Sequence, residues 1–129
     1  MADSILREKS KTFSKDIIFL CRKLKQNNIE FPLINQLLRS GTSVGANIHE
    51  AQYAQGTKDF ISKFEIALKE CNESEYWIDL LYETASLSEA DFKDIQAKCI
   101  ELRRMLVSSV TTLKKKLSAS TALPRTNKQ

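Results

Sequence analysis

Apolar residues recur every three or four positions through four long stretches of the chain, and this spacing limits the fold more than any other feature. An α-helix has about 3.6 residues per turn, so this spacing places the apolar residues on one face. The 129 residues include only three glycines and two prolines, too few for the many turns of a β-sandwich or barrel. The sequence therefore predicts four amphipathic helices, at residues 4–25, 32–56, 57–85 and 88–117.

Particular residues mark the ends of these helices. Pro32 suits a first helical turn, where its missing N–H is not needed. Gly56 is placed for a left-handed cap at the end of the second helix, and Thr57 is the expected N-cap of the third. Ser88 opens a capping-box pattern with Asp91. We therefore expect short connections between the helices.

Helices joined by short connections pack as antiparallel neighbours, so we expect an all-α, antiparallel up-down-up-down four-helix bundle. The bundle domain is predicted to span residues 1–118. Beyond it the composition changes to Ser, Thr, Ala, Pro and basic residues. We expect residues 119–129 to form a disordered basic tail.

The sequence favours a cytoplasmic protein. Its longest apolar runs fall far short of the roughly 20 residues that a membrane span requires, and the N-terminus has no apolar leader segment. Cys21, Cys71 and Cys99 are far apart and odd in number, which fits reduced thiols better than disulfides. We expect no membrane partner.

The second predicted helix has few charged residues, only Arg39 and Glu50 between residues 32 and 56. Its segment 40–47 contains Gly41 and Gly45, and each costs about 1 kcal/mol relative to alanine inside a helix. Small residues four positions apart let another helix approach closely. Three interpretations of this segment stay open: tight packing within the bundle, a subunit interface, or a kink or ligand site.

The same region resembles a known family. Residues 36–51 contain Gln-Leu-x-Arg, then serine, then Asn-Ile-x-Glu, followed by Lys-Asp-Phe at 58–60, Ile-Ala-Leu-Lys-Glu at 66–70 and Tyr-Trp at 76–77. This pattern resembles the bacterial four-helix-bundle family of proteins encoded in 23S ribosomal RNA intervening sequences. That family is related to the accessory protein of diversity-generating retroelements, which is thought to bind nucleic acid.

The resemblance implies a four-helix bundle that self-associates, typically as a ring-like homopentamer. Many family members have glycine after the Asn-Ile-x-Glu motif, whereas this chain has Ala51. We expect this difference to move the end of the second helix toward Gly56.

Patterns for catalysis and metal binding are missing from the sequence. His49 is the only histidine, so a catalytic triad would have to use it, and no nucleophile motif accompanies it. Zinc-ligand spacing, the Glu-x-x-His pairs of di-iron bundles and a phosphate-binding loop are also missing. We therefore expect no enzyme, and predict no catalytic residue, metal, cofactor or small-molecule substrate. An enzyme using His49 and Glu50 is the least favoured hypothesis.

Charge is unevenly distributed along the chain. Residues 1–25 have a net charge of +4, residues 26–56 of −1, residues 57–90 of −5 and residues 91–129 of +6. In one interpretation, opposite charges on neighbouring helices pair and each exposed pair contributes little. In the other, basic residues bind nucleic acid backbones without reading sequence. The predicted nucleic-acid-binding residues are Lys15, Arg22, Lys23, Arg103, Arg104, Lys114, Lys115 and Lys116.

We therefore expect a non-enzymatic, self-assembling four-helix-bundle protein. Its partners would be copies of itself, in a homo-oligomer such as a pentamer, and RNA or DNA bound without sequence preference. The alternative is a nucleic-acid-binding accessory subunit of a larger enzyme such as a reverse transcriptase. The residues predicted to form a polar stripe or subunit contact are Arg39, Ser43, Asn47, Glu50, Tyr76 and Trp77.

Overall fold

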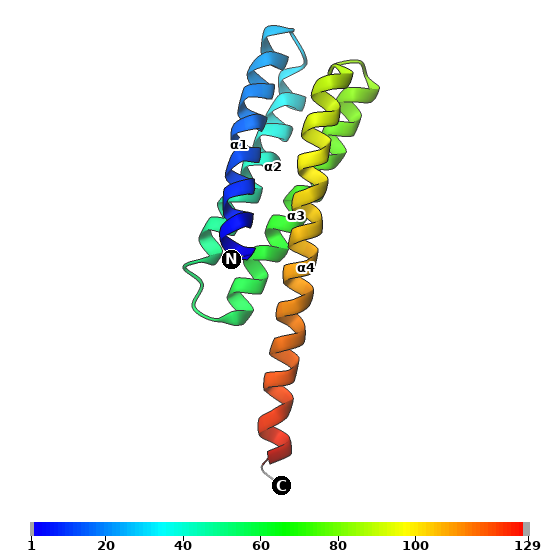
Figure 1. The fold of residues 1–129 in the computed structure, drawn as a ribbon. Coiled ribbons are helices and arrows are strands. Elements are labelled where there is room, and N and C mark those ends of the chain that lie inside the picture. Colours follow the sequence, from blue (N-terminus) through cyan, green and yellow to red (C-terminus); the bar gives the residue numbers. More distant parts are fainter. Residues whose placement is uncertain (1, 128–129) are drawn as a thin grey trace.

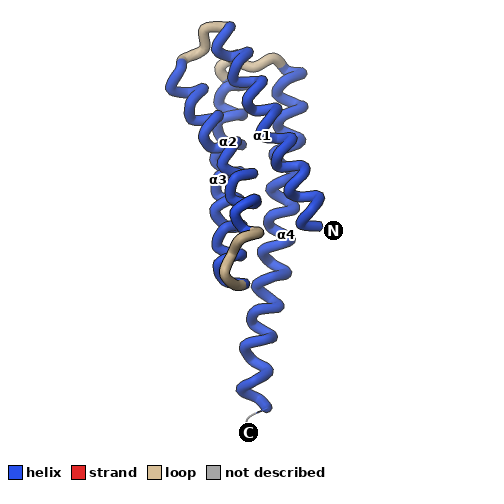
Figure 2. The backbone as a smooth tube through the Cα atoms, turned by 90° about the vertical axis from the view of Figure 1, so that its left-hand side faces the viewer, coloured by secondary structure: helices blue, strands red, loops and turns tan. Residues whose placement is uncertain are grey.

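The protein is a bundle of four helices. Its structure, a computed structural model, describes residues 2–127, and the side chains of residues 4–120. The helices are α1 (Ala2–Gln26), α2 (Phe31–Ala51), α3 (Thr57–Glu83) and α4 (Glu89–Asn127). The α1–α2 and α3–α4 connections lie at one end of the bundle and the α2–α3 connection lies nearer the other (Figures 1 and 2). The predicted up-down-up-down topology is confirmed.

The apolar faces of the four helices meet in one core. Each helix contacts its two neighbours around the bundle, so α1 packs on both α2 and α4. Burying a large apolar side chain stabilises by about 1.5–3 kcal/mol, and the ordering of the chain opposes this gain. The core is therefore stable only when all four helices pack together. Its largest fully buried side chains include Phe13, Ile17, Leu37, Ile48, Phe64, Ile78, Leu102 and Leu106.

Gly41 and Gly45 lie where α2 packs most closely on α1. A methyl group added to Gly41 would lie 2.8 Å from a side-chain carbon of Ile17. One added to Gly45 would lie 3.1 Å from the Ser14 hydroxyl and 3.3 Å from the carbonyl oxygen of Ser10. The tight-packing interpretation of segment 40–47 is thereby confirmed, while its use as a subunit interface stays a prediction.

The start of α4 is as predicted. The backbone N–H of Asp91 donates to the Ser88 hydroxyl at 3.1 Å, which satisfies one of the unpaired N–H groups of the first turn. The preceding helix, α3, ends at Glu83, and Ala85 just beyond it lies in the left-handed region (φ 59°). The Ser86 N–H then donates to the carbonyl of Leu81 at 2.8 Å, as in a Schellman cap. These caps fix the connection between α3 and α4.

Three expectations about the α2–α3 connection are wrong. α2 ends at Ala51, and Gly56 has an extended backbone (φ −176°, ψ −179°) instead of a left-handed one. Gly56 is the N-cap of α3, and Thr57 is its first residue. The reason is that N–H groups of residues 52–54 donate to carbonyls three residues earlier. These bonds tighten and close the last turn, so no glycine is needed there.

α4 is the longest helix, with 39 residues, or about 58 Å at 1.5 Å per residue. It projects well beyond the other helices (Figures 1 and 2). Leu113 and Leu117 still pack on the core, and residues 118–120 are exposed. α4 therefore includes most of the stretch predicted to be a disordered tail. Residues 128–129 of that stretch lie outside the described part. A domain boundary at residue 118 stays a prediction. No helix in the described residues has the length and hydropathy needed to cross a membrane.

All three cysteines are buried free thiols, as their positions on apolar stripes predict. Burial raises the pKa of the Cys21 thiol to about 11. Cys71 of α3 and Cys99 of α4 face each other, with their sulfur atoms 3.8 Å apart. The hydrogen bond to Cys71, together with burial, raises the pKa of Cys99 above its ordinary value. The Cys21 and Cys99 thiols therefore stay protonated at neutral pH.

We expect the native thiols to be inert toward an aromatic disulfide reagent at pH 8, because all three are buried and the raised pKa values of Cys21 and Cys99 disfavour their reactive thiolate form. Unfolding in denaturant should release three reactive thiols per chain. Since the folded pKa of Cys21 lies above its unfolded value of 9.0, its stabilising effect is present below pH 9 and is lost as the pH rises toward 11. Cys21→Ser should flatten this alkaline decline in unfolding free energy. Fast labelling of the native protein at pH 8 would contradict the prediction.

Candidate functional site

The polar stripe predicted on α2 faces α3. Arg39 forms ion pairs with both Glu70, at 3.4 Å, and Glu73 of α3. The hydrogen bond to Glu73 raises the pKa of Arg39. The indole N–H of Trp77 donates to Glu73 at 3.1 Å, and this bond and Arg39 lower the pKa of the Glu73 carboxyl. Arg39 thus connects α2 to the aromatic part of α3.

The rest of the stripe continues toward the end of α2. Ser43 donates to the carbonyl of Arg39, and Asn47 donates to that of Ser43 at 2.9 Å, so both use their hydrogen-bonding groups within α2. Glu50 forms an ion pair with Lys63 of α3 at 3.1 Å. Ser43 and Asn47 are half-buried. These hydrogen bonds and ion pairs of the stripe are thus formed within one chain.

A matching stripe runs along α3. Its members are spaced at three and four positions, and ion pairs or hydrogen bonds connect four of them to α2 or to one another. Ile66 lies among them with 40% of its side chain exposed. We call the two stripes together the α2–α3 face, formed by Arg39, Ser43, Asn47 and Glu50 of α2 and by Lys63, Ile66, Glu70, Glu73 and Trp77 of α3.

The charges on the α2–α3 face, two basic and three acidic, are all paired within the chain, and this pairing decides its character. Arg39 is paired with two glutamates and Glu50 with a lysine. The side chains between the pairs are uncharged or apolar. Tyr76 makes an edge contact with Trp77 (ring centroids 5.0 Å apart) and is 58% exposed. The structure places all six residues predicted for a polar stripe or subunit contact on or beside this face.

The eight predicted nucleic-acid-binding residues divide into two groups. Lys23 pairs with Asp91 at 2.7 Å, Arg103 with a glutamate at 3.0 Å and Lys114 with another at 2.7 Å. These three follow the interpretation in which charges pair across neighbouring helices. The other five have no acidic partner in the described residues, and they are Lys15, Arg22, Arg104, Lys115 and Lys116.

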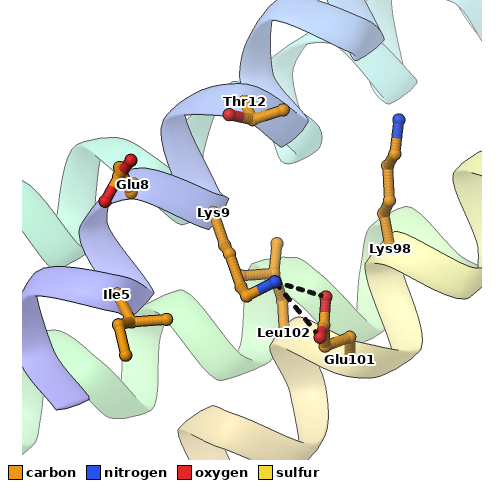
Figure 3. A pocket seen from close by; sticks show the side chains of 7 residues that line it. All are labelled: Ile5, Glu8, Lys9, Thr12, Lys98, Glu101 and Leu102. Atoms are coloured by element: carbon orange, nitrogen blue, oxygen red, sulfur yellow. Dashed lines mark hydrogen bonds and ion pairs between the residues drawn. The ribbon is translucent and has the colours of Figure 1, made fainter.

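A groove of about 310 Å³ runs between α1 and α4. Figure 3 shows Lys9 reaching across it to Glu101, at 3.3 Å. Lys98, on the same rim, donates to Asp16 of α1 at 2.6 Å, and this bond raises the lysine's pKa. Ile5 and the buried Leu102 also line the groove. Its two lysines are thus occupied by carboxylates.

A second groove, of about 540 Å³, lies between α1 and α2 and has a different character. Arg7 and Lys11 of α1 line it together with Gly45 and His49 of α2. His49 is exposed, and its ring makes an edge contact with Tyr53 (centroids 5.6 Å apart). The predicted site omits Arg7 and Lys11, although the four-residue steps from Arg7 to Lys11 and from Lys11 to Lys15 were a usable signal.

The arrangement of titratable groups points to binding surfaces. Within the described residues, no group of three or more His, Cys, Asp or Glu side chains is placed to hold a metal ion. Glu70 and Glu73 pair with Arg39. The charged side chains therefore sort into paired charges, among them those of the α2–α3 face, and a set of basic residues without acidic partners in the described part of the chain.

The comparisons with known proteins agree on one family. A family model described as 23S rRNA-intervening sequence protein matches residues 2–108, which include α1 to α3 and the first half of α4. The crystal structure of a protein of unknown function from the S23 ribosomal protein family of Bacteroides thetaiotaomicron is 41% identical, with a TM-score of 0.83. The match covers 86% of this chain and 99% of that chain. No curated protein matches the chain.

Proposed function

The chain belongs to the 23S rRNA-intervening sequence protein family, and on that premise we propose that it is a non-enzymatic, self-assembling scaffold in the cytoplasm. Copies of the chain associate through the α2–α3 face into a homo-oligomer, a pentamer as the sequence resemblance implies. The observation that carries the proposal is that this face is exposed while every charge on it is already paired within the chain.

The exposed side of a helix in a soluble monomer is normally charged. On the α2–α3 face the charged side chains are already paired within the chain, so a partner need not bury an unpaired charge, which would be costly. Ile66, Trp77 and Tyr76 supply apolar and aromatic surface of the kind enriched at interfaces. The three free thiols fit a reducing compartment.

Replacing Ile66 with glutamate is expected to dissociate the oligomer, because each copy would then bury an unpaired carboxylate. Light scattering at tens of micromolar should show wild-type particles of several chains and Ile66→Glu monomers. Val107→Glu on α4 is the matched control, since Val107 is 45% exposed against 40% for Ile66. A monomeric wild type would overturn the assembly proposal, and dissociation by Val107→Glu alone would move the interface to α4.

A second candidate function is nucleic acid binding, as in an accessory subunit of a larger enzyme such as a reverse transcriptase. The observation that favours it is the set of basic residues without acidic partners. Such residues bind phosphates and release counterions, so the affinity should fall steeply with salt. RNA or DNA binding by the wild-type protein that is insensitive to salt, or that is absent, would remove this candidate.

A further inference from the structure

Ion pairs cross three of the four contacts between neighbouring helices, but not the contact between α1 and α2. Three pairs join α1 to α4, three join α2 to α3 and two join α3 to α4. In the described residues no ion pair joins α1 to α2, and Arg7 of α1 instead donates to neutral Gln52 at 2.8 Å. This contact is therefore electrostatically different from the others.

The cause lies in α2. Its only charged side chains besides His49 are Arg39 and Glu50, and both pair with α3. Basic residues on the flank of α1 next to α2 therefore meet no carboxylate across the contact. They are exposed, and none has an acidic partner in the described residues. We call them the α1 basic stripe, which consists of Arg7, Lys11, Lys15, Arg22 and Lys25.

Helix geometry places the stripe on one flank. Lys9, Asp16 and Lys23, seven positions apart, all pair with α4 and so mark the opposite flank of α1. A turn of about 100° per residue puts residues 7, 11, 15, 22 and 25 on the α2 side and the outer side. From Arg7 to Lys25 the row is about 27 Å long at 1.5 Å per residue. It is thus a straight row of five positive charges.

The surface of α2 beside the α1 basic stripe carries small side chains and borders an open groove. At its N-terminal part the groove of about 540 Å³ runs from Arg7 and Lys11 to Gly45 and His49. Gly45 has no side chain, and Ala46 next to it is small and exposed. Glu8 is the acidic residue on the groove. An extended polyanion can therefore lie along α1 without steric obstruction by the side chains of α2.

Two exposed aromatic rings flank this surface. Tyr53 is 75% exposed and lies beside His49. Phe19 is 61% exposed and lies under the Arg22 guanidinium, 5.8 Å from it to the ring centroid. Bases of single-stranded nucleic acid stack on such rings while a basic surface holds the backbone.

We propose that the α1 basic stripe, flanked by Tyr53 and Phe19, is the surface that binds the phosphodiester backbone of single-stranded RNA or DNA. The proposal rests on the nucleic-acid-binding candidate function and assigns it to one face. It also separates that face from the α2–α3 face, so both can operate in one particle. The unpaired basic residues of α4 are not part of this surface.

The test compares two triple variants that each remove three positive charges without exposing a carboxylate. The stripe variant is Lys11→Gln, Lys15→Gln and Arg22→Gln, and the matched control is Arg104→Gln, Lys115→Gln and Lys116→Gln. Fluorescence anisotropy measures binding of labelled oligouridylate and oligothymidylate of about 15 nucleotides across a salt series. Circular dichroism confirms that both variants stay helical.

We expect the slope of log affinity against log salt concentration to be less steep by about 2 in the stripe variant than in wild type. Each contact with a phosphate of a single strand contributes about 0.7 to this slope. With equal affinity near 1 M salt, this slope change corresponds to about 100-fold weaker binding near 0.1 M. The control should stay within about threefold of wild type.

Equal losses in both variants, or a loss in the α4 variant alone, would overturn the assignment to the stripe while leaving nucleic acid binding intact. Failure of the wild type to bind either oligonucleotide would overturn both the candidate function and the inference. Binding to vesicles of phosphatidylserine and phosphatidylcholine in place of either oligonucleotide would also overturn it, because the stripe would then be a lipid-binding surface.

Discussion

Replacing Phe13 with alanine is expected to lower the free energy of unfolding by about 3–5 kcal/mol. The ring is fully buried, with 0% of its surface exposed, in a core to which all four helices contribute. Truncation removes its apolar contacts and leaves a cavity that rigid, close-packed helices fill only in part. In a domain of this size the melting temperature should fall by more than about 10 °C.

The matched control is Phe19→Ala, which makes the same chemical change on the same helix. Phe19 is 61% exposed, so its loss should cost at most about 1 kcal/mol, including its contact with Arg22. Urea unfolding followed by circular dichroism measures both variants. Similar midpoints for the two would show that α1 is not packed as the structure describes.

Replacing Gly41 with leucine is expected to cost about 3 kcal/mol or more, through crowding instead of a cavity. An added Cβ would lie 2.8 and 2.9 Å from the two γ carbons of Ile17. Ile17 is itself fully buried, and a β-branched side chain in a helix has one strongly preferred rotamer. The gain in helix propensity on losing glycine, about 1 kcal/mol, does not offset this clash.

Gly45→Ala separates crowding from the general effect of removing glycine. Its Cβ would lie 3.1 Å from the Ser14 hydroxyl, which can rotate, and 3.3 Å from a backbone oxygen of Ser10. The cost of the tight contact and the gain in helix propensity should nearly cancel. The free energy of unfolding, measured by thermal unfolding, should therefore change by less than about 1 kcal/mol. A Gly41→Leu variant as stable as Gly45→Ala would contradict the close approach of α1 and α2.

The scarcity of charge on α2 connects the two proposed surfaces. On one side its two charged residues are matched by α3, which leaves a face of paired charges suited to another protein chain. On the other side it has no carboxylate to offer, so the basic residues of α1 remain free. One compositional feature of one helix thus underlies both proposals.

Part of the candidate site was within reach of sequence reasoning. The polar residues of α2, from Arg39 to Glu50, share a face because of their spacing alone. Their partners were not predictable: Glu70 and Glu73 are as acidic as other residues of α3, and only the rotation of α3 about its axis selects them. For the same reason Lys23 and Lys15, both predicted to bind nucleic acid, differ in the structure, because only Lys23 meets a carboxylate of α4.

Four amphipathic helices with their apolar faces, and the cap at Ser88, follow from the sequence alone, because helical periodicity and capping depend on neighbours within a few positions of the chain. The close approach of Ile17 to Gly41, and which basic side chains lack acidic partners, are settled only when the helices pack together. These depend on how each helix is rotated and shifted against the next. That register is set by the packing of the whole core, which no single stretch of sequence encodes.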